Sequence, residues 1–501
     1  MAAHRGGRNR KDRTLVFHNL ENAKNIDYNN LENANTVLTA LKMCIIRKVG
    51  FMRRKITEEL INWKKKANGK YAILVDGARR VGKSYIVENF AKENYKSYIF
   101  IDFSKAPKEV VELFDTQLDN LDMLFLYISN YFGVRLYPRE SLIIFDEVQF
   151  CPRARAAIKH LVADGRYDYI ETGSLISIHK NIKDILIPSE EHHIYMYPMD
   201  FEEFLWAMDN ETLMPYIKDC YEHKREMGQV LHRKAMEYFR QYMIVGGMPQ
   251  AVEEYIKTKE FEEVDRIKRD ILTLYREDIH KHSEGYNLEV EAIFDEIPAQ
   301  LSKHEKKFIF SSAKPGAREK DLRQPFFWLS DARLVNNCYN STEPNIGLKM
   351  NMERTSLKSY FCDTGLLISH AFDEKGLVTE EIYKKLLFDK LSVNQGMLME
   401  NIVAQMLVAS GHRLYYYANS SREDAASRIE IDFLIAKSKI TNQHNISPIE
   451  VKSGDRYTLS SLKKFMKKYA LQTDIPYVLH TKDYMQKDGI EYLPVYMTPL
   501  L

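Results

Sequence analysis

The sequence contains few cysteines, and they are not arranged in pairs. Only five occur among its 501 residues, and no two of them have the spacing of a CxxC motif. The five are Cys44, Cys151, Cys220, Cys338 and Cys362. An odd, scattered set excludes a disulfide framework and a paired-cysteine zinc site. We therefore expect reduced thiols and a cytoplasmic location.

The sequence also lacks an excess of charge of either sign and any long hydrophobic run. Its 72 Lys and Arg residues nearly balance 70 Asp and Glu residues, which leaves a net charge of +2. This balance excludes a protein that coats nucleic acid through general positive charge, although it allows a local basic face. No segment approaches the roughly 18 consecutive apolar residues of a membrane helix, and no apolar signal sequence opens the chain. We expect no membrane partner.

Composition and length indicate a large globular protein with several domains. Hydrophobic residues make up 45% and charged residues 28% of the chain, values that exclude wholesale disorder. At roughly 150 residues per domain, the length suggests about three domains. Residues 1–51 differ from the rest, because they are basic and rich in Asn. We interpret them as a flexible or non-native extension before Met52, with a nucleic-acid-binding arm as the alternative.

Short apolar runs alternate with helical patterns from residue 71 onward. The runs cover residues 72–75, 98–103, 142–145 and 169–172. Apolar runs without alternation suit strands that are covered on both faces, and the segments between them are long enough for crossover helices. The pattern predicts an α/β fold with a parallel sheet.

The second half of the chain is more helical. Beyond residue 204 the pattern is mostly helical, with a sharp break at residues 246–249. Further helices are expected near 293–301, 322–335 and 397–410, and strands are expected near 359–362, 429–436 and 448–453. The arrangement before residue 372 is compatible with a winged helix.

A glycine-rich segment that ends in Lys-Ser follows the first apolar run. Residues 77–84 fit the pattern G-x-x-x-x-G-K-[ST] and stand directly before a helical segment, which is the context that a phosphate-binding loop requires. Gly77 and Gly82 let main-chain amides turn toward phosphates, Lys83 supplies a positive charge, and Ser84 can ligate Mg²⁺. The predicted ATP-binding loop comprises Gly77, Ala78, Arg79, Arg80, Val81, Gly82, Lys83 and Ser84.

Two adjacent carboxylates end the third apolar run. Asp146 and Glu147 directly follow residues 142–145, and ligands of open α/β sheets gather at the carboxyl ends of the strands. Asp146 is therefore a candidate ligand of nucleotide-bound Mg²⁺, and Glu147 is a candidate base for the attacking water. The alternative is an ordinary acidic strand end. Thr172 or Ser174, after the next run, is a candidate γ-phosphate sensor. Glu147 favours hydrolysis over transfer to a second substrate.

A second group of carboxylates stands near the C-terminus. Glu400 shares a helix face with apolar residues, which demands a partner for its charge. Asp432 lies in an alternating strand pattern, and Glu450 and Lys452 share one face of the next strand. These residues form a candidate Mg²⁺ site with Glu400, Asp432 and Glu450 as ligands and with Lys452 as a group that positions a water or helps to deprotonate it. The alternative for Glu450 and Lys452 is an exposed salt pair.

The order of these motifs resembles a family of prokaryotic AAA-type ATPases that carry a C-terminal domain of restriction-endonuclease-like fold, of the PD-(D/E)XK type. The segments that carry the resemblance are residues 77–84, 145–147, 172–174, 197–204, 245–249, 363–367 and 449–454. The resemblance implies an ATPase core over 52–205, a helical lid over 206–286, a winged-helix-like connector over 287–372 and a nuclease-like domain over 373–501. Residues 187–191 depart from the family's pattern, so no catalytic arginine is assigned.

These observations support one main functional hypothesis and one alternative. The main hypothesis is a Mg²⁺-dependent, ATP-hydrolysing AAA-type protein with catalytic residues Lys83 and Glu147, whose C-terminal domain binds or cleaves nucleic acid. DNA and a second copy of the chain are the candidate partners. The alternative is a nucleotide-switched module that binds DNA or protein and whose nuclease-like domain is inactive.

Overall fold

We describe a computed structural model of the chain. It describes residues 52–173, 189–283, 285–303, 306–345, 347–372, 383, 385, 395–419, 428–436, 443–454 and 456–501. Residues Arg53–Leu501 belong to one compact unit. The extension predicted over residues 1–51 lies outside the described residues, and so does Ser174.

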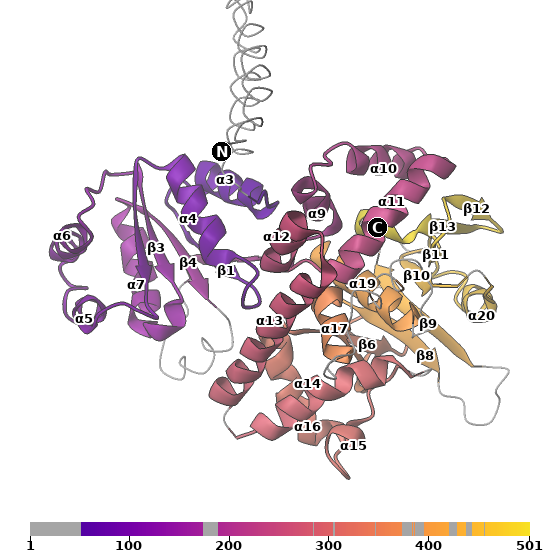
Figure 1. The fold of residues 1–501 in the computed structure, drawn as a ribbon. Coiled ribbons are helices and arrows are strands. Elements are labelled where there is room, and N and C mark those ends of the chain that lie inside the picture. The colour runs from indigo at the N-terminus through magenta and orange to yellow at the C-terminus, as the bar shows by residue number, and fades with distance from the viewer. Residues whose placement is uncertain are drawn as a thin grey trace, which may run out of the picture. The chain divides into compact units, whose positions relative to one another are not determined.

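A five-stranded parallel sheet forms the first part of the fold (Figure 1). Its order is β2-β3-β4-β1-β5, so that β4 lies between the strands that end in the glycine-rich loop and in the paired carboxylates. The strands are β1 Ala72–Asp76, β2 Ser97–Asp102, β3 Ser141–Asp146, β4 Asp168–Gly173 and β5 Glu191–Tyr195. The α/β fold with a parallel sheet is confirmed. The sequence pattern missed β5, because this edge strand is polar and only partly buried.

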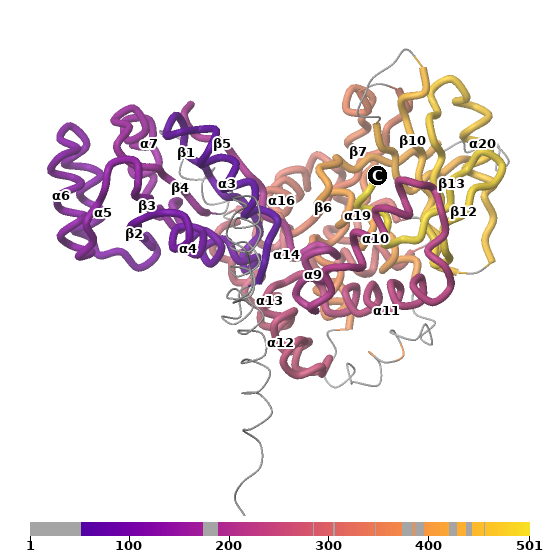
Figure 2. Tube along the Cα trace, turned by 90° about the horizontal axis from the view of Figure 1, so that it is seen from above, coloured from indigo at the N-terminus to yellow at the C-terminus, as the bar shows by residue number. Residues whose placement is uncertain are grey.

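Helices cover both faces of this sheet. Alternate strand residues face opposite sides, so Ile99, Ile143 and Phe145 join one apolar cluster with helices α5 to α7. Phe145 packs edge-on against Phe114 of α5, with ring centroids 5.4 Å apart. Figure 2 shows α4 on the other side of the sheet. The helices are α3 Ile56–Ala67, α4 Lys83–Asn94, α5 Lys108–Thr116, α6 Leu121–Phe132 and α7 Pro152–Asp164.

A run of helices follows, with the predicted break in the middle. Helix α9 begins at a capping box between Asp200 and Glu203. Helix α11 ends at Gly246, whose φ of +85° suits glycine, and Pro249 opens α12 in the first helical turn, where its missing N–H costs nothing. The helices are α9 Phe201–Ala207, α10 Leu213–Glu222, α11 Gln229–Val245, α12 Pro249–Thr258 and α13 Phe261–His282.

Three helices and a β-hairpin come next. The helices are α14 Asn287–Leu301, α15 Phe310–Ala313 and α16 Glu319–Asp331, and the hairpin is β6 Val335–Ser341 with β7 Met352–Phe361. The expected helix over 322–335 is wrong at its end. Arg333 has a φ of +60°, which breaks the helix, and Val335 already belongs to β6.

A mixed eight-stranded sheet contains this hairpin and the C-terminal strands. Its order is β12-β13-β11-β10-β9-β8-β6-β7, so the predicted boundary at residue 372 does not interrupt the sheet. The remaining strands are β8 Tyr415–Asn419, β9 Ile429–Ala436, β10 Ile446–Val451, β11 Tyr477–His480, β12 Met485–Lys487 and β13 Ile490–Pro494. The helices are α17 Thr364–Ala371, α19 Gln395–Ala409 and α20 Ser460–Lys468, and the 3₁₀ helix η5 spans Val495–Leu500.

The turn between α11 and α12 packs directly against the start of α17. The buried Asp363 carboxylate accepts a hydrogen bond from the Gly247 amide at 2.6 Å and one from the Leu366 amide at 2.9 Å. A Cβ atom on Gly365 would lie 2.6 Å from the Cα and the amide nitrogen of Gly246. Glycine is therefore required at residue 365 by a close approach of two backbones.

We predict that Gly365→Ala destabilises the protein by about 2–3 kcal/mol, because both clashing groups are backbone and cannot rotate away. The free energy of unfolding in urea measures this change. Gly396→Ala in α19 is the control, since its added Cβ meets only the Ser453 hydroxyl at an ordinary 3.9 Å. Equal stability of the two variants would contradict the packing described here.

Candidate functional sites

The glycine-rich loop lies between the end of β1 and the start of α4. Gly82 has a φ of +94° and Arg80 a φ of +70°, so the loop turns through left-handed conformations before α4 begins at Lys83. A Cβ atom on Gly77 would lie 2.2 Å from the Met196 carbonyl oxygen. Both glycines of the predicted motif are therefore demanded by the backbone.

Lys83 is buried, and its side chain folds back over the loop. Its Nζ donates hydrogen bonds to the carbonyl oxygens of Gly77 at 2.7 Å and Ala78 at 3.0 Å. Burial lowers the pKa of Lys83, while the nearby charge of Glu147 opposes that shift. The ammonium group therefore sits inside the loop, at the place where the motif puts phosphate oxygens.

Asp146 connects three elements at the carboxyl edge of the sheet. Its Oδ1 accepts a hydrogen bond from the Ser84 hydroxyl at 2.7 Å and a second from the Thr172 hydroxyl. Burial raises the pKa of Asp146, and these two hydrogen bonds oppose the shift. A hydroxyl and a carboxylate in contact are the oxygen donors that Mg²⁺ prefers. The residues present therefore fit the predicted metal.

Glu147 has a strained backbone. Its φ is +52°, a conformation that costs a non-glycine residue about 1–3 kcal/mol and that is concentrated at functional sites. The Glu147 carboxylate accepts a hydrogen bond from the Gln149 side chain, and its amide donates to the Thr172 hydroxyl at 3.4 Å. Because of this backbone turn, the two adjacent carboxylates point in different directions. Glu147 lines a cavity, whereas Asp146 accepts a hydrogen bond from Ser84.

That cavity has a volume of about 220 Å³ and adjoins the loop. The domain of the parallel sheet contributes Arg79, Lys83 and Glu147 to its wall together with three neighbouring residues, and the segments from α13 onward contribute the rest. Arg79 forms a salt bridge with Asp278 of α13 at 2.5 Å. The other lining residues are Ser104, Gln149, Phe150, Lys281, His282, Trp328, Ala332 and Leu334. The space beside Lys83 and Glu147 is therefore open to a ligand, and part of its wall comes from segments that follow the parallel sheet.

Two arginines, the buried Arg54 and the half-buried Arg333, hold the loop, and sequence reasoning missed both. Arg54 donates to the Val81 carbonyl oxygen at 2.9 Å and pairs with Glu203 at 3.1 Å. Arg333 donates to the Asp76 carboxylate, the last residue of β1, at 2.9 and 3.1 Å. Neither arginine belongs to a motif, and each contacts a residue more than a hundred positions away. Only the fold could have revealed them.

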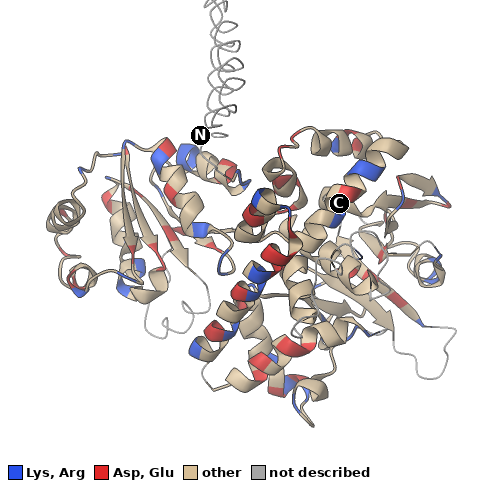
Figure 3. Ribbon diagram, in the orientation of Figure 1, with Lys and Arg blue, Asp and Glu red and all other residues tan. Residues whose placement is uncertain are grey.

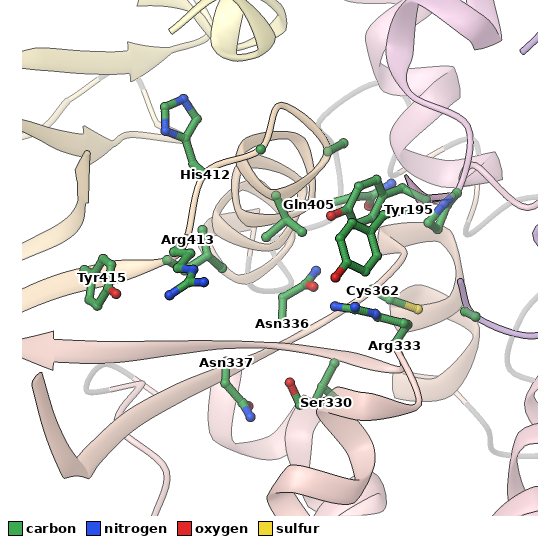
Figure 4. A pocket seen from close by; sticks show the side chains of 18 of the residues that line it. Tyr195, Ser330, Arg333, Asn336, Asn337, Cys362, Gln405, His412, Arg413 and Tyr415 are labelled. Carbon is green, nitrogen blue, oxygen red and sulfur yellow. The ribbon is translucent and has the colours of Figure 1, made fainter. Parts of the chain in front are cut away.

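Arg333 also lines a larger cavity of about 520 Å³ beside β1. Figure 4 shows Arg333 and Asn336, from the region where α16 gives way to β6, among the side chains around it. The guanidinium group of Arg333 lies 4.5 Å from the centre of the Tyr195 ring. Ala78 of the glycine-rich loop also lines this cavity, whereas Lys83, Asp146 and Glu147 do not.

The C-terminal carboxyl groups lie where α19 packs against the second sheet, with Glu400 and Glu450 buried and Asp432 half-buried. The Glu400 carboxylate pairs with Lys306 and accepts a hydrogen bond from the Tyr360 hydroxyl at 3.2 Å. Asp432 accepts a hydrogen bond from the Val451 amide at 2.8 Å. Glu450 is only 4% exposed and pairs with Lys452 at 2.5 Å. An exposed salt pair, the alternative considered for Glu450 and Lys452, is therefore excluded by burial.

These carboxyl groups repel one another. Burial raises the pKa of Glu450 to about 8, and the charge of Asp432 is the second cause. The same two causes raise the pKa of Glu400, in the same order. The Oε1 atom of Glu450 is buried and has no hydrogen-bond partner among the described residues. A positive charge or a hydrogen-bond donor placed beside this oxygen atom would therefore be favourable.

The predicted three-carboxylate metal site is not assembled in the structure. In the part of the chain that the structure describes, no group of three His, Cys, Asp or Glu side chains is arranged to hold a metal ion. Lysine side chains, instead of a metal ion, supply positive charge to acidic residues of this region. Lys306 binds Glu400, and the buried Lys358, which the sequence did not reveal, pairs with Glu430 at 2.8 Å. The roles of Asp432 and Glu450 as metal ligands remain predictions.

Comparison with protein families identifies three segments. Residues 69–205 match the AAA domain family, residues 236–375 match a domain of unknown function (DUF8612), and residues 395–497 match a second domain of unknown function (DUF4143). The first of these segments, which is similar to the AAA domain family, contains the parallel sheet and the loop around Lys83.

Individual relatives are distant. An uncharacterized protein of Methanocaldococcus jannaschii is 24% identical over 212 residues, which span 40% of this chain and 42% of that protein. A Walker-type ATPase of Pyrococcus abyssi is 14% identical, with a TM-score of 0.38, over 64% of this chain and 96% of that chain. The ORC1 protein of Aeropyrum pernix, solved in complex with DNA, is 11% identical, with a TM-score of 0.26, over 64% of this chain and 93% of that chain.

None of the described helices is both long and apolar enough to cross a membrane.

The raised pKa of Glu450 predicts a pH dependence of stability. A carboxyl group whose pKa rises on folding takes up a proton on folding, so its contribution favours the folded state at low pH and is lost as the pH rises toward about 8. Glu450→Gln should therefore gain stability relative to the unmodified protein between about pH 5 and pH 8.5, by at most about 1.4 kcal/mol per pH unit. Urea unfolding at several pH values measures the difference.

The control for this prediction is Glu237→Gln at an exposed position of α11. Its stability should follow that of the unmodified protein at every pH. A stability difference for Glu450→Gln that does not change with pH would show that Glu450 ionises normally in the folded protein.

Proposed function

We propose that this protein binds ATP with Mg²⁺ and hydrolyses it. The observation that carries the proposal is the meeting of Lys83, Ser84 and Asp146 at one edge of the sheet, with Glu147 facing the adjoining cavity. The AAA domain match over residues 69–205 supports it. Lys83 and the loop amides would hold the phosphates, and Ser84 and Asp146 would hold Mg²⁺, which screens the phosphate charge.

Glu147 is the base in this proposal. Its strained backbone aims the carboxylate into the cavity that also contains Lys83, where an attacking water would lie beside the γ-phosphate. Gln149 donates a hydrogen bond to this carboxylate and so fixes its direction. Thr172 contacts both Asp146 and the Glu147 amide, which suits the predicted role of sensing the γ-phosphate from β4.

We predict that Glu147→Gln lowers the rate of ATP hydrolysis by about 100-fold or more, because the amide cannot accept the proton of the attacking water. The affinity for ATP should change by no more than a few-fold. Lys83→Ala should instead weaken ATP binding by at least about tenfold, since it removes a charge-assisted contact to phosphate. Phosphate release and titration calorimetry measure the two effects.

Glu88→Gln, on the exposed side of α4 where Glu88 pairs with Lys92, is the matched control and should leave both measurements unchanged. Hydrolysis by Glu147→Gln at the normal rate would remove Glu147 from the mechanism.

We further propose that the C-terminal domain acts on nucleic acid through Asp432, Glu450 and Lys452. The unpaired Oε1 atom of Glu450 and the neighbouring charge of Asp432 carry this proposal, because a bound divalent cation would satisfy both. Lys452 would position water for attack on a phosphodiester. The PD-(D/E)XK resemblance of the residues around Glu450 supports this reading, and DNA and a second copy of the chain are the proposed partners.

The second candidate is a nucleotide-switched binding module with an inactive C-terminal domain. The pairing of Glu400 with Lys306 favours it, because a lysine there competes with a metal ion for the carboxylate. The salt bridge between Arg79 and Asp278 also favours it, because a nucleotide that displaced Asp278 from Arg79 would change the contacts of α13.

We predict that Mn²⁺ or Mg²⁺, added without nucleotide, raises the midpoint of thermal unfolding by a few degrees, and that Asp432→Asn removes the shift. Asp488→Asn, at an exposed turn, is the control and should keep it. Cleavage of plasmid DNA in the same buffers reports nuclease activity. A metal-induced shift that survives Asp432→Asn would contradict metal binding at this cluster and would favour the binding module.

A further inference from the structure

The large cavity beside β1 is walled by all three segments that match known families. The segment similar to the AAA domain family supplies residues 195–198, the DUF8612 segment supplies residues of α16 and β6, and the DUF4143 segment supplies the end of α19 and the loop before β8. The volume of about 520 Å³ lies in the range of ligand pockets, which occur preferentially between domains. A ligand in this cavity would contact all three segments at once.

The wall of this cavity carries positive charge and no negative charge. Both signs lie side by side on surfaces such as that of α13 (Figure 3), but the described residues that line the cavity include no Asp or Glu. Three lining residues are Lys or Arg. One of them, Arg333, is neutralised by the buried Asp76, which accepts its hydrogen bonds at 2.9 and 3.1 Å. We therefore treat Arg333 as part of the framework and not as a contact for a ligand.

The other two cations, Lys349 and Arg413, keep their charge available at the cavity. Both residues are exposed, and neither forms an ion pair with a described residue. Glu319, which lines a neighbouring cavity together with Lys349, is occupied by two hydrogen bonds of 2.8 Å from Arg323. Arg413 donates a hydrogen bond to the hydroxyl of Tyr415, which carries no charge. An anion in the cavity would therefore meet two cations that no acid has neutralised.

Tyrosine side chains form much of the remaining wall. Tyr195 and Tyr197 come from the end of β5 and the segment just after it, and Tyr339 and Tyr415 come from the second sheet. Burial raises the pKa of Tyr197 and of Tyr339, so both hydroxyls keep their protons and can donate hydrogen bonds. Aromatic rings with polar edges suit a ligand that contains a planar ring.

Asn336 presents an unused amide group to the same space. Its side chain has no hydrogen-bond partner in the part of the chain that the structure describes, whereas the amide of Gln405 accepts from the Thr364 amide and donates to the Tyr242 hydroxyl. Figure 4 shows Asn336 and Arg333 directed toward the same space. A carboxamide donates and accepts at once, which matches the hydrogen-bonding edge of a nucleic acid base.

We propose that this cavity binds one nucleotide unit. Lys349 and Arg413 are the cations for its phosphate, and the tyrosines and Asn336 contact its base. The chemistry is the same for a free nucleotide and for the end of a nucleic acid strand. The site is distinct from the proposed ATP site, since Lys83, Asp146 and Glu147 do not line the cavity, and it does not depend on ATP hydrolysis.

The composition of the wall argues against two other classes of ligand. A metal ion or an organic cation would find no carboxylate among the described residues of the wall. A wholly apolar ligand would leave the Asn336 amide and the tyrosine hydroxyls without partners, which is costly once water is excluded. A ring that carries a phosphate satisfies the cations, the amide and the aromatic faces together.

The test is titration calorimetry of the full chain, without Mg²⁺, against AMP, GMP, CMP and UMP and against a 5′-phosphorylated single-stranded DNA of about eight nucleotides. We expect at least one of these probes to bind at one molecule per chain. The titrations are repeated with Lys83→Ala, which disables the proposed ATP site. Because the cavity does not contain Lys83, the probe should bind this variant with an affinity within about twofold of the original.

The cations are tested by a matched pair of double variants. Lys349→Gln with Arg413→Gln should bind the probe at least about tenfold more weakly, because charge-assisted contacts to phosphate are lost. Arg233→Gln with Lys467→Gln removes the same residue types from exposed positions on α11 and α20, outside the cavity, and should bind within about twofold of the unmodified protein. Lys349→Arg with Arg413→Lys keeps both charges and should retain most of the affinity.

Asn336 is tested by its effect on base preference. Asn336→Ala should narrow the differences in affinity among the four monophosphates, because the amide that contacts the base edge is gone. A role in folding alone would lower all four affinities equally. Unchanged differences among the four would overturn the assignment of the base to Asn336.

The outcomes separate this cavity from the proposed ATPase. Binding of a monophosphate identifies a free nucleotide as the ligand, binding of the DNA alone identifies a strand end, and either result supports the cavity. No binding of any probe would overturn it, and so would equal affinities of the glutamine double variant and its control. Loss of binding in Lys83→Ala would place the nucleotide in the loop instead. Retained monophosphate binding in a protein that hydrolyses no ATP would remove the ATPase and leave the cavity.

Discussion

The hydrogen bond between the Ser84 hydroxyl and the Asp146 carboxylate is the contact on which the nucleotide site depends. It joins the first turn of α4 to the end of β3, although β4 separates β3 from β1 in the sheet. Thr172, at the end of the intervening strand β4, donates a hydrogen bond to the same carboxylate. A parallel sheet brings the carboxyl ends of all three strands to one edge, where a loop of amides, a hydroxyl and two acids can act on one ligand.

Charged contacts join the domain of the parallel sheet to later parts of the chain. Arg333 reaches Asp76 at the end of β1, and Asp278 of α13 reaches Arg79 in the phosphate-binding loop. Asp363 holds the turn after α11 by the Gly247 amide. In the proposed function, a phosphate that enters the loop would compete with Asp278 for Arg79, and nucleotide binding would thereby act electrostatically on α13.

Most of the domain with the parallel sheet could be predicted from the sequence, because its signals are local. Residues 77–84 form one continuous segment of loop and first helical turn, and buried strands such as β3 appear as unbroken apolar runs. The edge strand β5 has no such run, and the end of α16 depends on the positive φ of Arg333. The C-terminal acids were found by spacing, yet their lysine partners Lys306 and Lys358 come from distant segments. Contacts over long sequence separations leave no periodic pattern, so only the fold reveals them.

The most direct test of the central claim compares the affinities of the unmodified protein for ATP and for adenosine, with and without Mg²⁺, by titration calorimetry. If the loop holds the phosphates through Lys83 and the metal through Ser84 and Asp146, ATP with Mg²⁺ should bind at least about 100-fold more tightly than adenosine, and Asp146→Asn should reduce the effect of Mg²⁺. Equal affinities for ATP and adenosine, whatever the metal concentration, would contradict the account.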